Sequence, residues 1–197
     1  MRYKIETLAA GLGHPEGPDD LPDGRIVMVE TYTSKIIAWS PERRIHDCAL
    51  CGGGSDVCMM GAHGRIYLTD PGGYFPDDRS TGRLFVLNQD GSGELLQEIP
   101  DAHPTGIVAE HNGSIVWVKS YDRCVYRRRP GGISELIQLL PENRLPNGPK
   151  IAADSSLWIT AFMGGGAPMD GRLWRIPVGV TGMPLFRGKV GRDDFRL

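Results

Sequence analysis

The sequence lacks any apolar segment long enough to cross a membrane. No stretch approaches the roughly 20 consecutive apolar residues that a transmembrane helix needs. Residues 1–17 also lack the apolar core of a secretory signal peptide. We therefore expect a cytoplasmic protein that has no membrane partner.

An excess of charge of one sign is also absent. The formal net charge is −2 over 197 residues, and neither end of the chain carries a run of lysine or arginine. The one basic cluster, residues 127–129, precedes a Pro-Gly-Gly turn and is typical of a solvated strand end. We therefore expect no nucleic-acid partner, because such binding needs a basic surface.

Cysteine is sparse, and its spacing does not match a metal site. The chain has four cysteines, of which Cys48 and Cys51 form a C-x-x-C pair. No second pair and no histidine pair follow at zinc-finger spacing. Because the cytoplasm keeps thiols reduced, we expect buried free thiols instead of disulfides.

Helical periodicity and the common catalytic motifs are missing as well. No Gly-x-Ser-x-Gly elbow, phosphate-binding loop or dinucleotide fingerprint is present. Glycine and proline are abundant, at 27 and 15 residues, and they separate short apolar runs instead of gathering in one linker. With 40% hydrophobic residues the chain can form a core, and the pattern predicts an all-β protein with many turns.

Four segments of the chain share one pattern, in which a turn precedes two short strands of alternating apolarity. The turns lie at Gly24, Gly64, Gly113 and Ser155, in steps of 40, 49 and 42 residues. Four-stranded propeller blades repeat at roughly 40 to 50 residues. The sequence therefore predicts a β-propeller with four recognisable blades in one domain over residues 1–197. A β-sandwich also has short strands, but it would not require such similar repeats.

The last 20 residues do not continue this pattern. Residues 178–197 carry several basic side chains and no further copy of the repeat. We expect them to form a tail that does not make a full blade.

Residues with a side-chain oxygen recur eight positions before each of these turns: Glu16, Asp56, Thr105 and Asn147. In a propeller the strand that follows each of them lines the channel, so equivalent positions converge on one axis. Two carboxylates with a hydroxyl and an amide are the ligands that a hard cation such as Ca²⁺ prefers. The set predicts a divalent-metal site at the channel mouth. A plainer alternative is that Pro-Thr-Gly and Pro-Asn-Gly form turns on conformational grounds alone.

The motifs around these positions resemble the senescence-marker-protein/gluconolactonase/regucalcin family in order and spacing, over roughly residues 5 to 177. They are His14-Pro15-Glu16-Gly17-Pro18, Gly64-Arg65-Ile66-Tyr67-Leu68-Thr69-Asp70, His103-Pro104-Thr105-Gly106-Ile107, and Asn147-Gly148 with Leu157-Trp158-Ile159. The resemblance implies a six-bladed propeller that hydrolyses lactones with a divalent metal in its channel. Six blades need roughly 270 residues, so we expect a shortened ring: one of four or five blades, one that closes through a partner chain, or an incomplete one. An open ring would expose strand edges, so we also expect self-association.

The ligand set departs from the family pattern. Glu16 matches the family's glutamate ligand. Asp56 and Thr105 stand where asparagine is usual, and Asn147 stands where the family has an aspartate that acts as ligand and base. One carboxylate has therefore changed blades.

The resemblance implies a metal-dependent hydrolase of a lactone or similar small cyclic ester. Asp56 and Asn147 occupy the catalytic positions, and we expect His103 and Tyr74 to contact the substrate. Ca²⁺ is the first choice of metal, with Mg²⁺, Mn²⁺ and Zn²⁺ as alternatives. The alternative function is a non-catalytic metal- or ligand-binding propeller, degenerate or truncated, because an amide at position 147 cannot accept a proton as a base.

Overall fold

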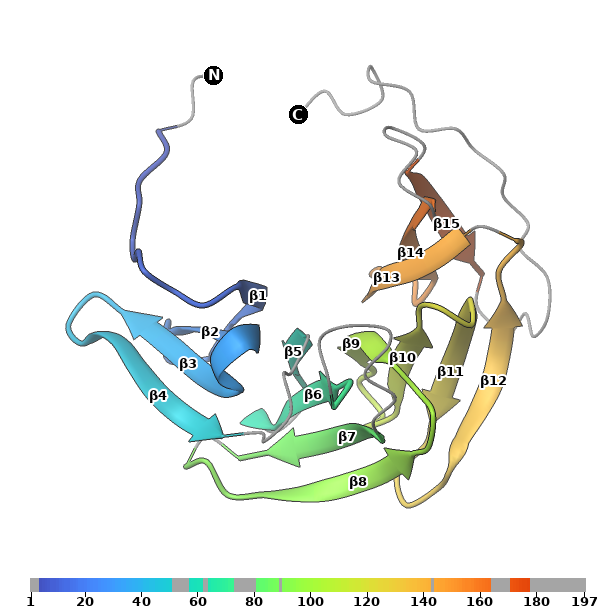
Figure 1. Ribbon diagram of the computed structural model, residues 1–197, viewed down its shortest axis with the longest axis horizontal. Coiled ribbons are helices and arrows are strands. Elements are labelled where there is room, and N and C mark those ends of the chain that lie inside the picture. Colours follow the sequence, from blue (N-terminus) through green and yellow to red (C-terminus); the bar gives the residue numbers. More distant parts are fainter. Residues whose placement is uncertain are drawn as a thin grey trace.

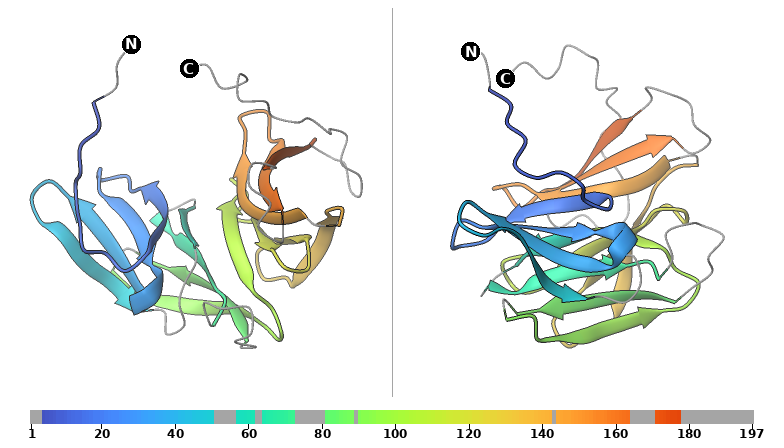
Figure 2. Two further views of the ribbon diagram at one scale, coloured as in Figure 1. Left: turned by 45° about the horizontal axis from the view of Figure 1, so that its top comes forward. Right: turned by 60° about the vertical axis from the view of Figure 1, so that its left-hand side comes forward.

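The protein is represented by a computed structural model, which describes residues 4–50, 57–61, 64–72, 81–88, 90–142, 144–163 and 171–177. This part of the chain folds into four antiparallel sheets, which lie as an arc around a common axis (Figure 1). The first and fourth sheets occupy the two ends of the arc. Views from other directions show the sheets twisted and facing one another around this axis (Figure 2).

Each sheet is one blade, and its strands are paired in chain order. The first blade contains β1 (Pro15–Asp20), β2 (Ile26–Glu30), β3 (Lys35–Ser40) and β4 (Arg44–Leu50), with a 3₁₀ turn η1 (Thr31–Thr33) after β2. The second contains β5 (Val57–Met60), β6 (Ile66–Asp70), β7 (Gly82–Leu87) and β8 (Gly93–Ile99). The third contains β9 (Pro104–Ala109), β10 (Ile115–Lys119), β11 (Cys124–Arg128) and β12 (Ser134–Leu139). The fourth contains β13 (Arg144–Ile151), β14 (Leu157–Met163) and β15 (Arg172–Ile176).

The predicted β-propeller architecture is confirmed. Each predicted turn precedes the second strand of a blade, namely β2, β6, β10 and β14. Contacts between neighbouring blades run through the inner strands, from β1 to β5, from β5 to β9 and from β9 to β13. No helix in the described ranges is both long and apolar enough to cross a bilayer.

The core lies between the blades, and the second strands of the second and third blades, β6 and β10, are covered on both faces. In β10 the run Ile115 to Val118 is almost completely buried, which explains its continuous apolar sequence. Trp117 is 1% exposed, and its Nε1 donates a hydrogen bond to Ser134 Oγ at 2.9 Å. Truncating a buried tryptophan of this kind to alanine costs about 3–5 kcal/mol.

The cysteines agree only partly with the sequence prediction. Cys48 and Cys124 are free thiols, but both are half-buried instead of fully buried. Burial raises the pKa of the Cys48 thiol, so it stays protonated and weakly reactive near neutral pH. Cys51 lies outside the described residues.

Candidate metal centre at the channel mouth

Three of the inner strands carry the same irregularity near their first residues. The pairing of β1 with β2 shifts directly after Glu16. The pairing of β9 with β10 shifts at Thr105, and that of β13 with β14 shifts at Asn147. Such β-bulges redirect side chains and are common beside functional sites. The three candidate oxygens therefore lie at one level of equivalent strands.

The backbones of the third and fourth blades meet at these bulges. A Cβ atom on Gly106 would lie 1.7 Å from the main-chain oxygen of Asn147 and 2.4 Å from Cδ of Pro149. Only glycine allows this approach. The structure thus brings the backbone segments of Thr105 and Asn147 together.

Thr105 belongs to a buried hydrogen-bond chain that links three blades. Thr69 Oγ1, at the end of β6, donates to the Thr105 carbonyl. Thr105 Oγ1 lies 2.5 Å from Ser120 Oγ, and Ser120 Oγ donates to the Pro146 carbonyl. Because the Ser120 proton goes to Pro146, Thr105 is the donor in its contact with Ser120. The Thr105 hydroxyl therefore has only lone pairs left for a cation.

Sequence reasoning missed the two hydroxyl partners of Thr105. The signal that could have found them is a small hydroxyl residue at the end of an apolar strand, Thr69 after Leu68 and Ser120 after Lys119. Both are almost fully buried, where a hydroxyl needs a hydrogen-bond partner.

Glu16 is the one charged candidate ligand among the described residues. Its side chain is 45% exposed, and Oε1 lies 3.9 Å from Nδ1 of His14. In the described part of the chain no lysine or arginine forms an ion pair with it. Its negative charge is therefore available to a cation. Glu16 lies on the first blade and Asn147 on the fourth, at opposite ends of the arc (Figure 1).

Asn147 is exposed and lines a cavity of about 380 Å³ on the fourth blade. The cavity is mostly apolar, and its other lining residues are Thr160, Ala161, Phe162, Gly171, Arg172 and Leu173. The backbone N–H of Gly148 donates to Thr160 Oγ1 at 3.0 Å, which fixes the bulge beside Asn147. Asn147 thus lies at the edge of a space large enough for a small ligand.

Two predicted site residues, Asp56 and Tyr74, lie outside the described residues. Asp56 directly precedes β5 in the sequence, and Val57 pairs with Thr69. Within the described ranges no group of three or more histidine, cysteine, aspartate or glutamate side chains could hold a metal ion. The predicted ligand set contains only two acidic residues, and one of them, Asp56, lies outside the described residues. The metal site therefore remains a prediction.

His103 is half-buried beside the bulge of β9, the inner strand of the third blade. Its ring meets the Tyr121 ring edge-on, with centroids 5.0 Å apart. Burial lowers the pKa of His103 below its ordinary value of 6.5, so the imidazole is neutral near neutral pH. His14 contacts Tyr32 in the equivalent position of the first blade, also at 5.0 Å. Sequence reasoning missed both tyrosines, although each stands eight residues after a repeat glycine.

Asp70 is a fully buried carboxylate at the same end of the second blade. Gly72 N–H donates to its Oδ1 at 2.7 Å, and an Arg83 guanidinium nitrogen lies 3.0 Å from Oδ2. Desolvation outweighs both contacts and raises the pKa of Asp70. A buried carboxyl of raised pKa next to Thr69 is a candidate proton carrier, but its ion pair with Arg83 also fits a structural role.

No family model matches the chain, and no curated protein matches it. Several solved structures do match. A gluconolactonase from Xanthomonas campestris is 18% identical with a TM-score of 0.64, over 89% of this chain and 66% of that one. The calcium-binding protein regucalcin from Agrobacterium tumefaciens is 12% identical with a TM-score of 0.57, over 90% and 76%. A streptogramin B lyase is 18% identical with a TM-score of 0.64, over 87% of this chain and 57% of the lyase.

This chain shares its fold with gluconolactonase and regucalcin. The resemblance read from the sequence is therefore confirmed for the fold. The chain spans little more than half the length of the lyase, and the lyase matches as well as the gluconolactonase does. At these identities the likeness shows a β-propeller and does not distinguish a hydrolase from a lyase.

Proposed function

We propose that the protein is a divalent-cation-dependent hydrolase of lactones or similar small cyclic esters, with its reaction centre at the bulged ends of the inner strands. The observation that supports this most is the shared bulge, which sets Glu16, Thr105 and Asn147 at one level of equivalent strands. β-bulges are over-represented next to active sites, where they redirect side chains.

The accessible donors fit a hard cation. Glu16 offers a carboxylate without a competing lysine or arginine in the described part, and Asn147 offers an exposed amide oxygen. Asp56 would supply the second negative charge. The regucalcin that shares this fold is a calcium-binding protein, which makes Ca²⁺ the first ion to test. When bound, such an ion polarises an ester carbonyl as a Lewis acid.

The side chains of this site divide the remaining work by their chemistry. An amide cannot accept a proton, so Asn147 orients the substrate, and Asp56 is the proposed base that takes a proton from water. His103 is neutral near neutral pH and can donate or accept a hydrogen bond at the edge of the site. Tyr74 is a proposed contact to the ring of the substrate.

A second candidate is a non-catalytic propeller that binds a cation or a small ligand. It is favoured by the Thr105 hydroxyl, whose proton is already committed to Ser120. It is also favoured by the absence of a carboxylate at position 147.

A screen of lactone hydrolysis with added Ca²⁺, and after chelation, tests these two functions together. We expect hydrolysis that needs the cation, is lost in Glu16→Gln and is kept in Glu42→Gln, which removes a charge from an exposed turn. Stabilisation by Ca²⁺ without turnover of any lactone would favour the binding propeller. If Ca²⁺ neither stabilises the protein nor supports turnover of any lactone, the cation site is rejected.

A further inference from the structure

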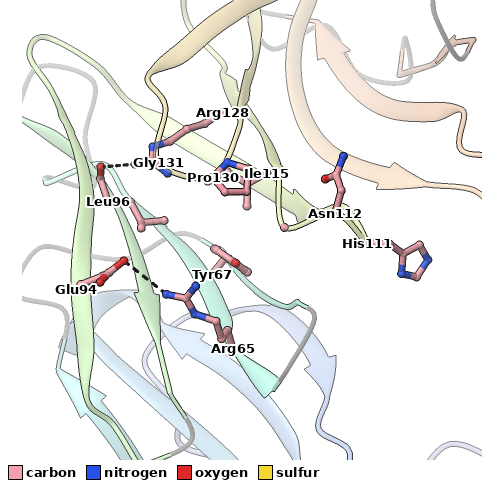
Figure 3. Close-up of a pocket in the computed structure, with 11 residues that line it drawn as sticks. Arg65, Tyr67, Glu94, Leu96, His111, Asn112, Ile115, Arg128, Pro130 and Gly131 are labelled. Atoms are coloured by element: carbon pink, nitrogen blue, oxygen red, sulfur yellow. Dashed lines mark hydrogen bonds and ion pairs between the residues drawn. The ribbon is translucent and has the colours of Figure 1, made fainter.

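A second cavity of about 360 Å³ lies between the second and third blades, at the end opposite the bulges. One wall is formed by Arg65 and Tyr67 of the second blade, with Leu96 of β8 beside them. The other wall is formed by Ile115 and Arg128 of the third blade (Figure 3). This volume is within the range of small-molecule sites.

Arg128 differs from its neighbours in having no carboxylate partner among the described residues. Arg127 donates to Glu110 Oε1 and Arg129 donates to Glu135 Oε2, each at 2.8 Å. Arg128 instead donates from Nη2 to the Leu96 carbonyl at 3.1 Å. Its Nε is shielded from solvent and has no acceptor among the described residues.

The charge of Arg128 is therefore not neutralised within the described structure. A guanidinium carries five N–H donors, and most of those of Arg128 remain available to a ligand. A half-buried charge without a counter-ion is unfavourable and is relieved by an anion.

Arg65 adds a second guanidinium from the facing wall. Its Nη2 lies 3.5 Å from Oε1 of Glu94, whose side chain is 64% exposed. The Arg65 guanidinium also lies 5.9 Å from the centroid of the Tyr67 ring. The cavity is lined by two guanidinium groups, Arg65 and Arg128, and by one carboxylate, Glu94, so its lining has an excess of positive charge. Figure 3 shows the two guanidinium groups on opposite sides, with Leu96 and Tyr67 flanking the space between them.

We propose that this inter-blade cavity binds a small organic carboxylate. The carboxylate oxygens accept hydrogen bonds from Arg128 and Arg65, for which the planar guanidinium is well suited. The carbon body of the ligand lies against Leu96, Ile115 and the Tyr67 ring. The cavity is separate from the channel mouth, so this site does not depend on the proposed hydrolase activity.

Isothermal titration calorimetry with benzoate tests the site, because benzoate joins a carboxylate to a flat apolar body. We expect saturable binding of benzoate and much weaker binding of benzamide, which keeps the shape and lacks the charge. Arg128→Gln and Arg65→Gln should each weaken binding about tenfold, or about 1.4 kcal/mol. Arg129→Gln, which removes the same charge from an exposed ion pair, should leave binding unchanged.

Binding of benzamide as tight as benzoate, or an equal loss in Arg129→Gln, would overturn the proposal. So would the absence of saturable benzoate binding at millimolar concentration, or tighter binding of inorganic phosphate than of benzoate. Because Arg128 also links the two blades through Leu96, circular dichroism must show a folded variant. Arg65→Gln leaves that link intact and keeps the test decisive if Arg128→Gln does not fold.

Discussion

The main-chain oxygen of Asn147 occupies the space that a side chain on Gly106 would need, with a Cβ atom of residue 106 only 1.7 Å from it. The oxygen is main chain and the position of a Cβ atom is fixed by the main chain, so the contact cannot be relieved by a change of rotamer. The inner strands β9 and β13 of neighbouring blades therefore contact each other at the level of the candidate site, and at residue 106 this contact leaves room only for glycine.

Gly106→Ala should therefore destabilise the protein strongly. Overpacking costs typically about 1–3 kcal/mol, and we expect the upper end or more here because two backbones must separate. Gly132→Ala is the matched control, since its nearest neighbour would be the Arg129 carbonyl oxygen at 3.4 Å. Urea unfolding measures both changes. Equal stability of the two variants would contradict the close approach of the third and fourth blades.

The blade repeat could be predicted from the sequence because it is encoded locally. Gly24 and Gly113 adopt positive φ angles in turns, and each precedes a run of alternating or continuous apolar residues. Turn chemistry and apolar patterning are properties of neighbouring residues, so they need no knowledge of distant contacts. The prediction that the candidate oxygens occupy equivalent positions of successive blades came from the same repeat.

What the sequence could not predict depends on contacts between blades. The Thr105 hydroxyl is bonded to Ser120, and Ser120 is bonded to Pro146 on another blade. Likewise, Arg128 faces Leu96, which is 32 residues away along the chain. Such pairings depend on how two twisted sheets face each other, and no local pattern specifies them.

Asp154 should make stability depend on acid pH. It accepts hydrogen bonds from Ser156 Oγ at 2.5 Å and Ser156 N–H at 2.9 Å, and from Arg175 at 2.7 Å. These contacts lower the pKa of Asp154 from 3.8 to about 2. The native state therefore binds fewer protons than the unfolded state between these values, and stability falls as the pH falls through this range.

The Asp154→Asn variant isolates this contribution. It should have a lower melting temperature than the wild type near neutral pH, and the difference should vanish near pH 2. Asp101→Asn is an exposed control at a position of positive φ, which asparagine tolerates. A difference that stayed constant over the whole pH range would show that the Asp154 charge has no part in it.

His103 should titrate below its ordinary pKa of 6.5, because burial disfavours the charged imidazolium. The native state then binds fewer protons than the unfolded state, so this histidine reduces stability as the pH falls below about 6.5. NMR titration of the His103 ring measures the shift. Tyr121→Ala should move the pKa back toward 6.5, because it removes the ring that covers one edge. A pKa at or above 6.5 in the wild type would contradict a desolvated imidazole.

Ca²⁺ should raise the melting temperature if the predicted ligands hold it. Binding to the native state stabilises by about 2.7 kcal/mol at a hundredfold excess over the dissociation constant. Glu16→Gln and Asp56→Ala should remove most of this gain, because they delete the two predicted carboxylates. Asn147→Ala should weaken it moderately, and Glu42→Gln should not change it. No shift in the wild type at millimolar Ca²⁺ would exclude the site.

Asn147→Asp should increase lactone turnover, because it places a proton acceptor where the resembling family has one. A base must lie within about 2.6–3.2 Å of the water that it activates. We expect Asp56, whose carboxylate belongs to a different blade from the family's base, to meet this requirement less well. We therefore expect low wild-type activity and a gain in the variant.

The added carboxylate at position 147 also strengthens cation binding, so turnover of the two proteins must be compared at saturating Ca²⁺. Asn112→Asp adds the same charge in a turn at the opposite end of the blades and should leave turnover unchanged. If the wild type is already a vigorous lactonase and Asn147→Asp slows it, then Asp56 or Glu16 is the working base. In that case the amide at position 147 is suited to orienting the ester. A carboxylate introduced at this position would compete with Asp56 or Glu16 for the water.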